Sequence, residues 1–166
     1  MIFADLVAGE AIFLDANTLV YHFSQHVAFG SACSALLRRI ERGEVTAYTS
    51  SHVLSEVCHK LMTLEACAVN NWVPAGVANR LKRHPAAVQQ LVHFQQAMSR
   101  IPQSGIQVLP LSLLQIVAGA ALSRQLGLLT NDSLIVAVMQ ANGLTKLASQ
   151  DRDFDRVPGL TRYAAV

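Results

Sequence analysis

The sequence predicts an α/β fold, a sandwich of helices around one mostly parallel sheet. First, short apolar runs alternate along the chain with longer segments of helical periodicity. Second, 52% of the residues are hydrophobic and only 14% are charged, so the chain can bury a large core. Third, its 166 residues contain no repeat, low-complexity tract or Ser/Gly linker. We therefore expect residues 1–166 to form a single domain.

The N-terminal half of the chain is predicted to contain two strands, each followed by a helix. In order, these are a strand at Ala11–Leu14, a helix at Ser31–Arg42, a strand at Val45–Thr49 and a helix from Ser50 or Ser51 to about Leu64. The first strand stops at Asp15, and the first helix ends at Gly43, a residue type that commonly terminates helices. Either serine can cap the second helix because its hydroxyl accepts from a free backbone N–H group.

The C-terminal half continues the alternation after an extra helical segment. Residues 66–104 are expected to form additional helices, interrupted at Pro74 and Pro85 and closed by Pro102 and Gly105. The remaining elements are a strand at Ile106–Leu109, a helix at about Ser112–Gln125 that stops at Gly127, a helix capped by Thr130 or Asn131 that ends at Gly143, a strand at Leu144–Ala148 and a fifth strand at Thr161–Val166.

The sequence argues against a membrane span and a secretory signal. The most apolar stretch, Leu113–Leu122, is far short of the ~20 residues that a bilayer requires. The N-terminus has no basic region and is interrupted by Asp5 and Glu10. Three cysteines form no C-x-x-C pair, which is typical of core residues in a reducing compartment. We expect a cytoplasmic protein.

The charges are unevenly distributed. Residues 66–131 contain five basic residues and no carboxylate, a local charge of +5, whereas the rest of the chain sums to −3. This asymmetry favours an anionic partner. Within the segment, Arg80, Lys82 and Arg83 are candidates for contacts with a nucleic-acid backbone, and a solvated helix face is the alternative interpretation.

Several carboxylates are expected to meet at one edge of the sheet. Asp15 follows the first strand directly, Asp151 and Asp153 lie just past the fourth, and Asp132 begins a helix. Ligands of open parallel sheets bind outside the carboxyl ends of the strands, which is where these residues fall. Glu56 lies within an otherwise apolar helix. Taken singly, each acid has a structural alternative: a helix-start charge, a loop carboxylate or a solvated helix position.

A cation is expected among these acids because gathered carboxylates repel one another. Oxygen ligands of this kind suit Mg²⁺ or Mn²⁺ rather than zinc. His52 and His59 are two turns apart on one predicted helix, too far to bind the same metal. Divalent ions held by carboxylates, beside a basic segment, fit the hydrolysis of phosphodiester bonds.

Four segments carry these acids in order: FLDANTLVY around Asp15, SEV around Glu56, TNDSLIVAVM around Asp132 and LASQDRDF around Asp151. Together they resemble the motifs of PIN-domain ribonucleases, and most closely the VapC-type toxins of bacterial toxin–antitoxin pairs. The resemblance runs from about residue 11 to the C-terminus. It implies a PIN-like three-layer sandwich with about four to five strands, extended here by the helical segment at about 66–104.

The resemblance also implies a function, a Mg²⁺- or Mn²⁺-dependent endoribonuclease that cleaves RNA. The implied catalytic quartet is Asp15, Glu56, Asp132 and Asp151, with Asp153 as an additional metal-binding acid. Asn17 or Thr18, together with Ser149, match polar positions that support the acids through hydrogen bonds. A protein antitoxin and a second copy of the chain, forming a homodimer, are the implied partners.

Three alternatives stay open. A PIN-type RNA-processing nuclease without an antitoxin has the same motifs. A phosphatase of the haloacid dehalogenase type has a first motif similar to DANTL, but here Asn17 replaces its second aspartate and its glycine is missing. An inactive RNA-binding subunit is disfavoured because all four acids of the quartet are present.

Overall fold

A five-stranded sheet forms the centre of the computed structural model, which describes all 166 residues. The strands are β1 (Ala11–Leu14), β2 (Thr46–Ser50), β3 (Gln107–Leu109), β4 (Lys146–Ala148) and β5 (Thr161–Tyr163), in the spatial order β3-β2-β1-β4-β5. Every neighbouring pair is parallel. The chain leaves β1 toward β2 and later returns to its other side as β4, so the topology reverses between β1 and β4.

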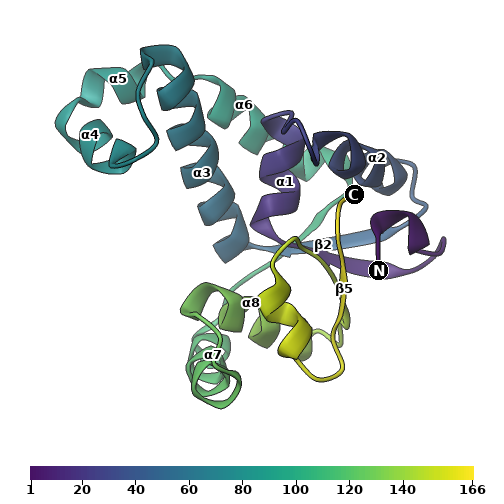
Figure 1. Cartoon of the computed structure of the whole chain (residues 1–166). Coiled ribbons are helices and arrows are strands. Elements are labelled where there is room, and N and C mark those ends of the chain that lie inside the picture. Colours follow the sequence, from purple (N-terminus) through teal and green to yellow (C-terminus); the bar gives the residue numbers. More distant parts are fainter.

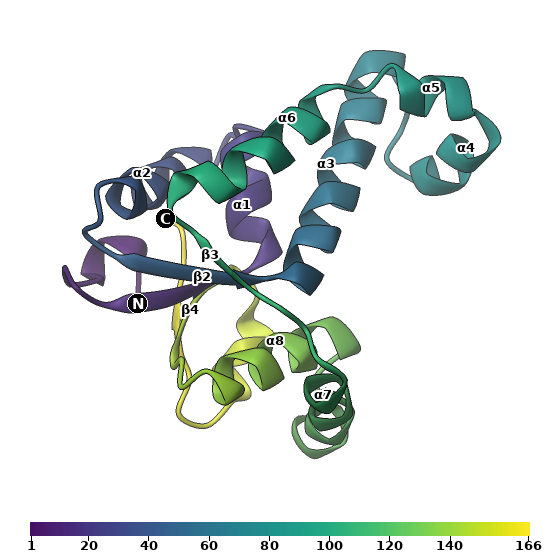
Figure 2. The same ribbon diagram turned by 180° about the vertical axis from the view of Figure 1, so that it is seen from behind.

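Helices cover both faces of this sheet (Figures 1 and 2). The eight α-helices are α1 (Ala16–Phe23), α2 (Gly30–Glu41), α3 (Ser51–Asn70), α4 (Val77–Arg83), α5 (Pro85–Gln89), α6 (His93–Arg100), α7 (Leu113–Leu126) and α8 (Thr130–Ala141). Short 3-10 turns occupy Phe3–Asp5, Ile101–Ser104 and Arg152–Arg156. Both views place α1 and α2 on one side of the sheet and α7 and α8 on the other. The predicted three-layer α/β sandwich is confirmed.

The core lies between these layers. Ile12, Phe13 and Leu14 of β1 are fully buried, as expected for a central strand covered on both faces. Phe154, from the turn after β4, is also fully buried and anchors that turn to the core. The end of the central strand and the loop after β4 therefore rest on rigid supports.

The predicted elements are largely present, with three corrections. A helix that was not predicted, α1, begins directly after Asp15, whose side chain accepts from the Ala16 N–H group and caps it. Helix α3 runs past Leu64 to Asn70, because further apolar contacts made by Ala66 continue its buried face. Neither Thr130 nor Asn131 caps α8: the extended residue before it is Leu129, and no side chain caps that end.

Helices α4 and α5 form an arm at the far end of α3 (Figure 1). A small separate cluster of Ala66, Val77, Leu81 and Leu91 holds this arm together. Helix α6 then returns along α3, and its start is fixed by Glu65, which accepts from the backbone N–H groups of Val92, His93 and Phe94 at 2.7, 2.9 and 2.9 Å. Within the predicted helical segment at 66–104, α4 and α5 therefore extend from the sandwich, whereas Ala97 and Ile101 are buried in the main core.

Helix α7 is apolar but mostly exposed. Its close contact with α8 is made through Gly119, where a Cβ atom would lie 2.8 Å from the side chain of Leu134. Leu113, Leu114 and Val117 are 73%, 82% and 62% exposed. No single helix is long and apolar enough to cross a membrane, and α7 and α8 reach that length only across a bend of 116°.

Candidate active site

The site begins at the carboxyl ends of the two central strands, where the sheet topology reverses. Asp15 follows β1, is 6% exposed, and accepts from the Ala16 N–H group at 2.5 Å. Its other oxygen accepts from the hydroxyl of Ser149, which follows β4, at 2.7 Å. Ser149 thereby ties the ends of β1 and β4 together and fixes the orientation of the Asp15 carboxylate.

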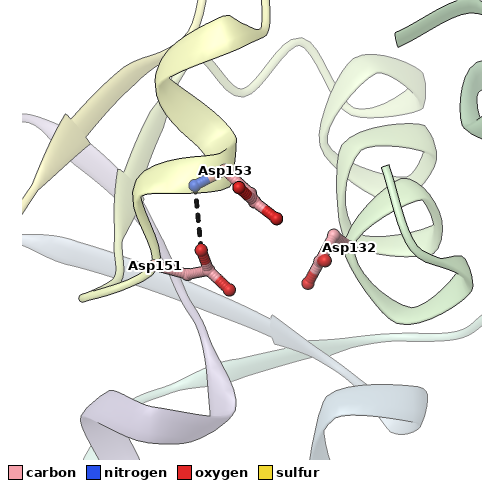
Figure 3. A group of neighbouring side chains, drawn as sticks. All are labelled: Asp132, Asp151 and Asp153. Atoms are coloured by element: carbon pink, nitrogen blue, oxygen red, sulfur yellow. Dashed lines mark hydrogen bonds between the residues drawn. The ribbon is translucent and has the colours of Figure 1, made fainter. Parts of the chain in front are cut away.

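Three more aspartates face one another beside this pair (Figure 3). Asp132 projects from α8, and Asp151 and Asp153 come from the turn after β4. One carboxylate oxygen from each lies within 4.8 Å of the others. Asp153 donates its backbone N–H to Asp151 at 2.8 Å, and Asp151 donates its own to the Ser149 hydroxyl at 3.0 Å. The tight turn thus orients both acids toward α8.

Glu56 reaches the site from α3. One of its oxygens is 2.7 Å from the ammonium of Lys60, one turn further along the same helix. The other oxygen accepts from the Asn131 side chain at 3.3 Å, which links α3 to the start of α8. Glu56 is therefore held by two donors, one on its own helix and one at the start of α8.

The pKa values of Asp132 and Asp15 are raised, and the neighbouring acids contribute to both shifts. Burial, reinforced by the charges of Asp151, Asp15, Asp153 and Glu56, raises the pKa of Asp132 from 3.8 to about 6. Burial also raises the pKa of Asp15, although hydrogen bonds from Ser149 and Ala16 oppose the shift. The predicted quartet and Asp153 therefore lie within range of one another's charges.

The donor set fits a hard divalent cation. Asp132 and Asp151 form no ion pair, whereas Asp153 pairs with Arg156 and Glu56 with Lys60. All the converging side chains are carboxylates, with no histidine or cysteine among them. Mg²⁺ and Mn²⁺ prefer such oxygen ligands.

The predicted supporting residues divide into two kinds. Asn17 and Ser149 both donate hydrogen bonds to Asp15, at 3.5 and 2.7 Å, so both contact an acid of the site. The Thr18 hydroxyl instead donates to the Ala148 carbonyl at 2.9 Å and is buried. Thr18 thus fastens α1 to β4 and makes no hydrogen bond to an acid.

The three predicted RNA-binding residues lie away from the acids. Arg80, Lys82 and Arg83 are exposed on α4, which packs on α3 near Ala66. Ala66 is nearly three turns beyond Glu56, about 15 Å along the helix axis. The Arg80 guanidinium lies 5.0 Å from the centre of the Trp72 ring, a cation–π contact within the arm.

Two basic residues pair with acids of the site: Lys60, which was not anticipated, and Arg156, whose pairing within the loop DRDFDR the sequence allows. Lys60 lies on the same helix as Glu56 at the i,i+4 spacing, and that spacing is a sequence signal for an ion pair. Arg156 donates to Asp153 and also to the Gly127 carbonyl at 3.1 Å. Since Gly127 belongs to the α7–α8 connection, the sequence alone offers no signal for this second contact.

A family model and two curated proteins each match most of this chain. The model of the family described as PIN domain matches residues 12–160. Ribonuclease VapC13 of Mycobacterium tuberculosis is 28% identical over 154 residues, which cover 92% of this chain and 99% of that protein. VapC ribonuclease Mb1869c of Mycobacterium bovis matches with the same identity and coverage.

Two solved structures share the fold. VapBC2 from Rickettsia felis, bound to a DNA fragment from its promoter, aligns with a TM-score of 0.60 at 19% identity, covering 94% of this chain and 99% of that one. VapC20 of M. tuberculosis, described as a toxin that cleaves the sarcin–ricin loop, aligns with a TM-score of 0.56 at 22% identity, covering 89% and 95%. Because the family match spans all four acidic segments, the chain belongs to the PIN-domain family.

Proposed function

We propose that this protein is a Mg²⁺- or Mn²⁺-dependent endoribonuclease and the toxin of a toxin–antitoxin pair. The observation that carries the proposal is the convergence of Asp15, Glu56, Asp132, Asp151 and Asp153 at the point where the sheet topology reverses. The similarity to VapC13, a ribonuclease by name, supports the same reaction. We place this activity in the cytoplasm, where RNA is available.

The acids divide the work of the site. Asp15, Asp132 and Asp151 are the proposed ligands of the principal ion, Asp153 is an additional ligand and Glu56 completes the acidic pocket. When bound, the ion supplies an activated water and neutralises charge on the phosphodiester. Ser149 and Asn17 keep Asp15 oriented by hydrogen bonds. The protein thus contributes mainly positioning and charge.

Arg80, Lys82 and Arg83 are proposed to bind the RNA backbone outside the cleavage point, since the arm holds them away from the acids. Such contacts set affinity rather than the rate of the chemical step. Replacing all three with glutamine is expected to raise KM for RNA and to leave kcat near its original value.

A protein antitoxin is the proposed inhibitor. The VapBC2 complex shares this fold, and a toxin–antitoxin complex from Klebsiella pneumoniae aligns with a TM-score of 0.52 at 19% identity. A mainly apolar groove of about 870 Å³ between α1, α3 and α6, lined in part by Val20, Leu61 and Phe94, offers a place for a partner helix. A basic side chain extended from such a partner would block the acidic site.

We also propose a homodimer formed through α7. Leu113, Leu114 and Val117 are exposed apolar side chains in the first turns of α7, and Leu129, beyond the other end of the helix, is 75% exposed. The only charged residue of α7 is Arg124 in its last turn, so the apolar first half of the helix is a suitable surface for a symmetric contact with its own copy. Light scattering is expected to give a dimer for the wild-type protein and a monomer for the Leu114→Glu, Val117→Glu double variant.

The first test is cleavage of a structured RNA pool by the purified protein in Mg²⁺, Mn²⁺ or EDTA. We expect cleavage with either ion, none in EDTA, and none for Asp15→Asn under any condition. Hydrolysis of small phosphomonoesters with phosphorylation of Asp15 would instead indicate a phosphatase. RNA binding without cleavage by the intact protein would indicate a binding subunit.

Expression in cells separates the toxin from a processing nuclease. Induction of the wild-type protein is expected to arrest growth, and induction of Asp15→Asn is not. Growth arrest that is relieved by a small protein encoded next to this one would identify the antitoxin. Normal growth during induction of an active nuclease would contradict the toxin assignment.

A further inference from the structure

Lys60 is the centre of a hydrogen-bonded chain that crosses the acidic site. Its ammonium lies 2.7 Å from Glu56 on α3 and donates to the side-chain oxygen of Asn17 on α1 at 3.0 Å. The amide of Asn17 in turn donates to Asp15 at 3.5 Å. Lys60 therefore connects two predicted members of the quartet that lie on different elements.

This arrangement differs from an ordinary helix ion pair. An exposed Glu–Lys pair four residues apart needs no third partner and contributes little to stability. Here the lysine has a second partner on another helix, and its charge lowers the pKa of the buried Asp15 against the effect of burial. The side chains of Lys60 and Glu56 are 37% and 22% exposed, so part of this ion pair is accessible to solvent.

We propose that Lys60 binds a phosphate oxygen of the RNA beside the cleaved bond, an inference that rests on the proposed nuclease function. The ammonium is a three-donor point charge that two neutral or acidic oxygens already orient. Glu56 and Asn17 act as positioning residues that hold it at the site. In the absence of RNA, the same lysine neutralises part of the negative charge of the acidic pocket.

The proposal gives Lys60 opposite effects on the two ligands of the site. A positive charge beside the carboxylates repels a divalent cation and attracts RNA. Lys60→Gln is therefore expected to bind Mn²⁺ about three- to tenfold more tightly than the wild type. The same variant is expected to bind RNA more weakly. A purely structural lysine would weaken both or change neither.

The test uses three variants of the full chain. Lys60→Gln removes the charge, Lys60→Arg keeps it, and Lys146→Gln is the matched control. Lys146 also pairs with a glutamate, Glu10, but at the opposite edge of the sheet. Mn²⁺ affinity is measured by calorimetry on RNA-free protein. RNA affinity is measured in EDTA with a labelled single-stranded 20-nucleotide RNA over a range of salt concentrations.

For Lys60→Gln we expect tighter Mn²⁺ binding, weaker RNA binding and a salt dependence of RNA binding that is shallower by about one unit on logarithmic axes. In cleavage assays KM should rise about tenfold with a smaller change in kcat. Lys60→Arg and Lys146→Gln should match the wild type in RNA affinity and salt dependence. Unchanged Mn²⁺ and RNA affinities in Lys60→Gln, with an active wild type, would overturn the role of Lys60 alone. A wild-type protein that neither binds nor cleaves RNA would overturn the proposed function and this inference together.

Discussion

Acidic residues lie at both ends of the strands, but they are paired with basic residues at the amino ends and largely unpaired at the carboxyl ends. At the amino ends of the strands, the glutamates just before β1 and β2 have basic partners: Glu10 pairs with Lys146, and Glu44 with Arg39 at 3.3 Å and with Arg42 at 3.8 Å. Arg39 also donates to the carbonyl groups of Phe3 and Leu6, which joins the N-terminal segment to α2. These pairs neutralise Glu10 and Glu44 and connect segments that are separate in the chain.

At the carboxyl ends, five carboxylates share two cations. Lys60 pairs with Glu56 and Arg156 with Asp153, which leaves Asp15, Asp132 and Asp151 without an ion pair. The pKa values show the contrast: a hydrogen bond from Lys146 lowers the pKa of Glu10, whereas burial and neighbouring acids raise that of Asp132. A group of acids with excess negative charge is typical of a binding site, whereas an isolated balanced pair is typical of a structural contact.

Neutralising an acid should therefore have opposite consequences at the two edges. Asp15→Asn, Glu56→Gln, Asp132→Asn and Asp151→Asn are each expected to lower RNA cleavage about a hundredfold or more, because each removes charge that binds or positions the reacting groups. None should lower the melting temperature of the metal-free protein. Glu10→Gln should do the reverse, with full cleavage and a slightly lower melting temperature. Both properties are read from initial cleavage rates and thermal unfolding. Full activity in any of the four, or their failure to fold, would contradict the assignment of the site.

Much of this site follows from the sequence because it is built at strand ends. Asp15 comes directly after a recognisable apolar run and Asp151 lies just past another, and parallel strands bring such residues to one edge whatever the order of the strands. The motif resemblance then adds Glu56, which periodicity alone leaves on an ordinary helix face.

What could not be predicted depends on contacts between distant segments. Helix α1 was missed because Thr18, Val20 and Tyr21 favour strands, whereas the cap supplied by Asp15 and the tertiary contacts favour a helix. The role of Lys60 depends on Asn17, forty-three residues away in sequence. Asn131, expected as a helix cap, is instead a donor to Glu56.

Glu65 and Glu56 lie on the same helix, α3, and give the same comparison between a structural acid and an acid of the site. Three backbone N–H groups satisfy the carboxylate of Glu65 at the start of α6. Although burial opposes the shift, these bonds lower its pKa. Glu65→Gln should reduce the free energy of unfolding by about 1–3 kcal/mol, since buried donors lose a charged acceptor. Cleavage measured well below the melting temperature should be unchanged. A loss of cleavage as large as that of Glu56→Gln would contradict the purely structural role of Glu65.

The pH dependence of stability tests the unbalanced charge directly. The pKa of Asp132 is about 6 in the folded protein and 3.8 as the ordinary value, so the folded state binds more protons between these pH values. The contribution of Asp132 to the free energy of unfolding of the metal-free protein should therefore fall as the pH rises from 4 to 6, by about 1 kcal/mol once solvent screening is allowed for. Urea unfolding across this range measures the effect. Asp132→Asn should flatten it, and Mn²⁺ at pH 7 should restore stability to the wild type. A free energy of unfolding that rises with pH in the wild type relative to Asp132→Asn would contradict the crowding of the acids.

Asp153 combines the properties of both groups of acids, and its substitution should have the smallest effect on RNA cleavage. It belongs to the aspartate cluster, yet it already has a cation, because Arg156 pairs with it as Lys146 pairs with Glu10. Asp153→Asn should therefore lower cleavage only severalfold, less than about tenfold. Arg156→Gln frees the carboxylate and also releases the contact with the Gly127 carbonyl, so it should bind Mn²⁺ more tightly than the wild type. Titration of Mn²⁺ into both variants, alongside cleavage rates, separates the two contributions. A hundredfold loss in Asp153→Asn would make Asp153 equal to Asp132 and Asp151, and an ion pair would then be no guide to which acids bind the metal.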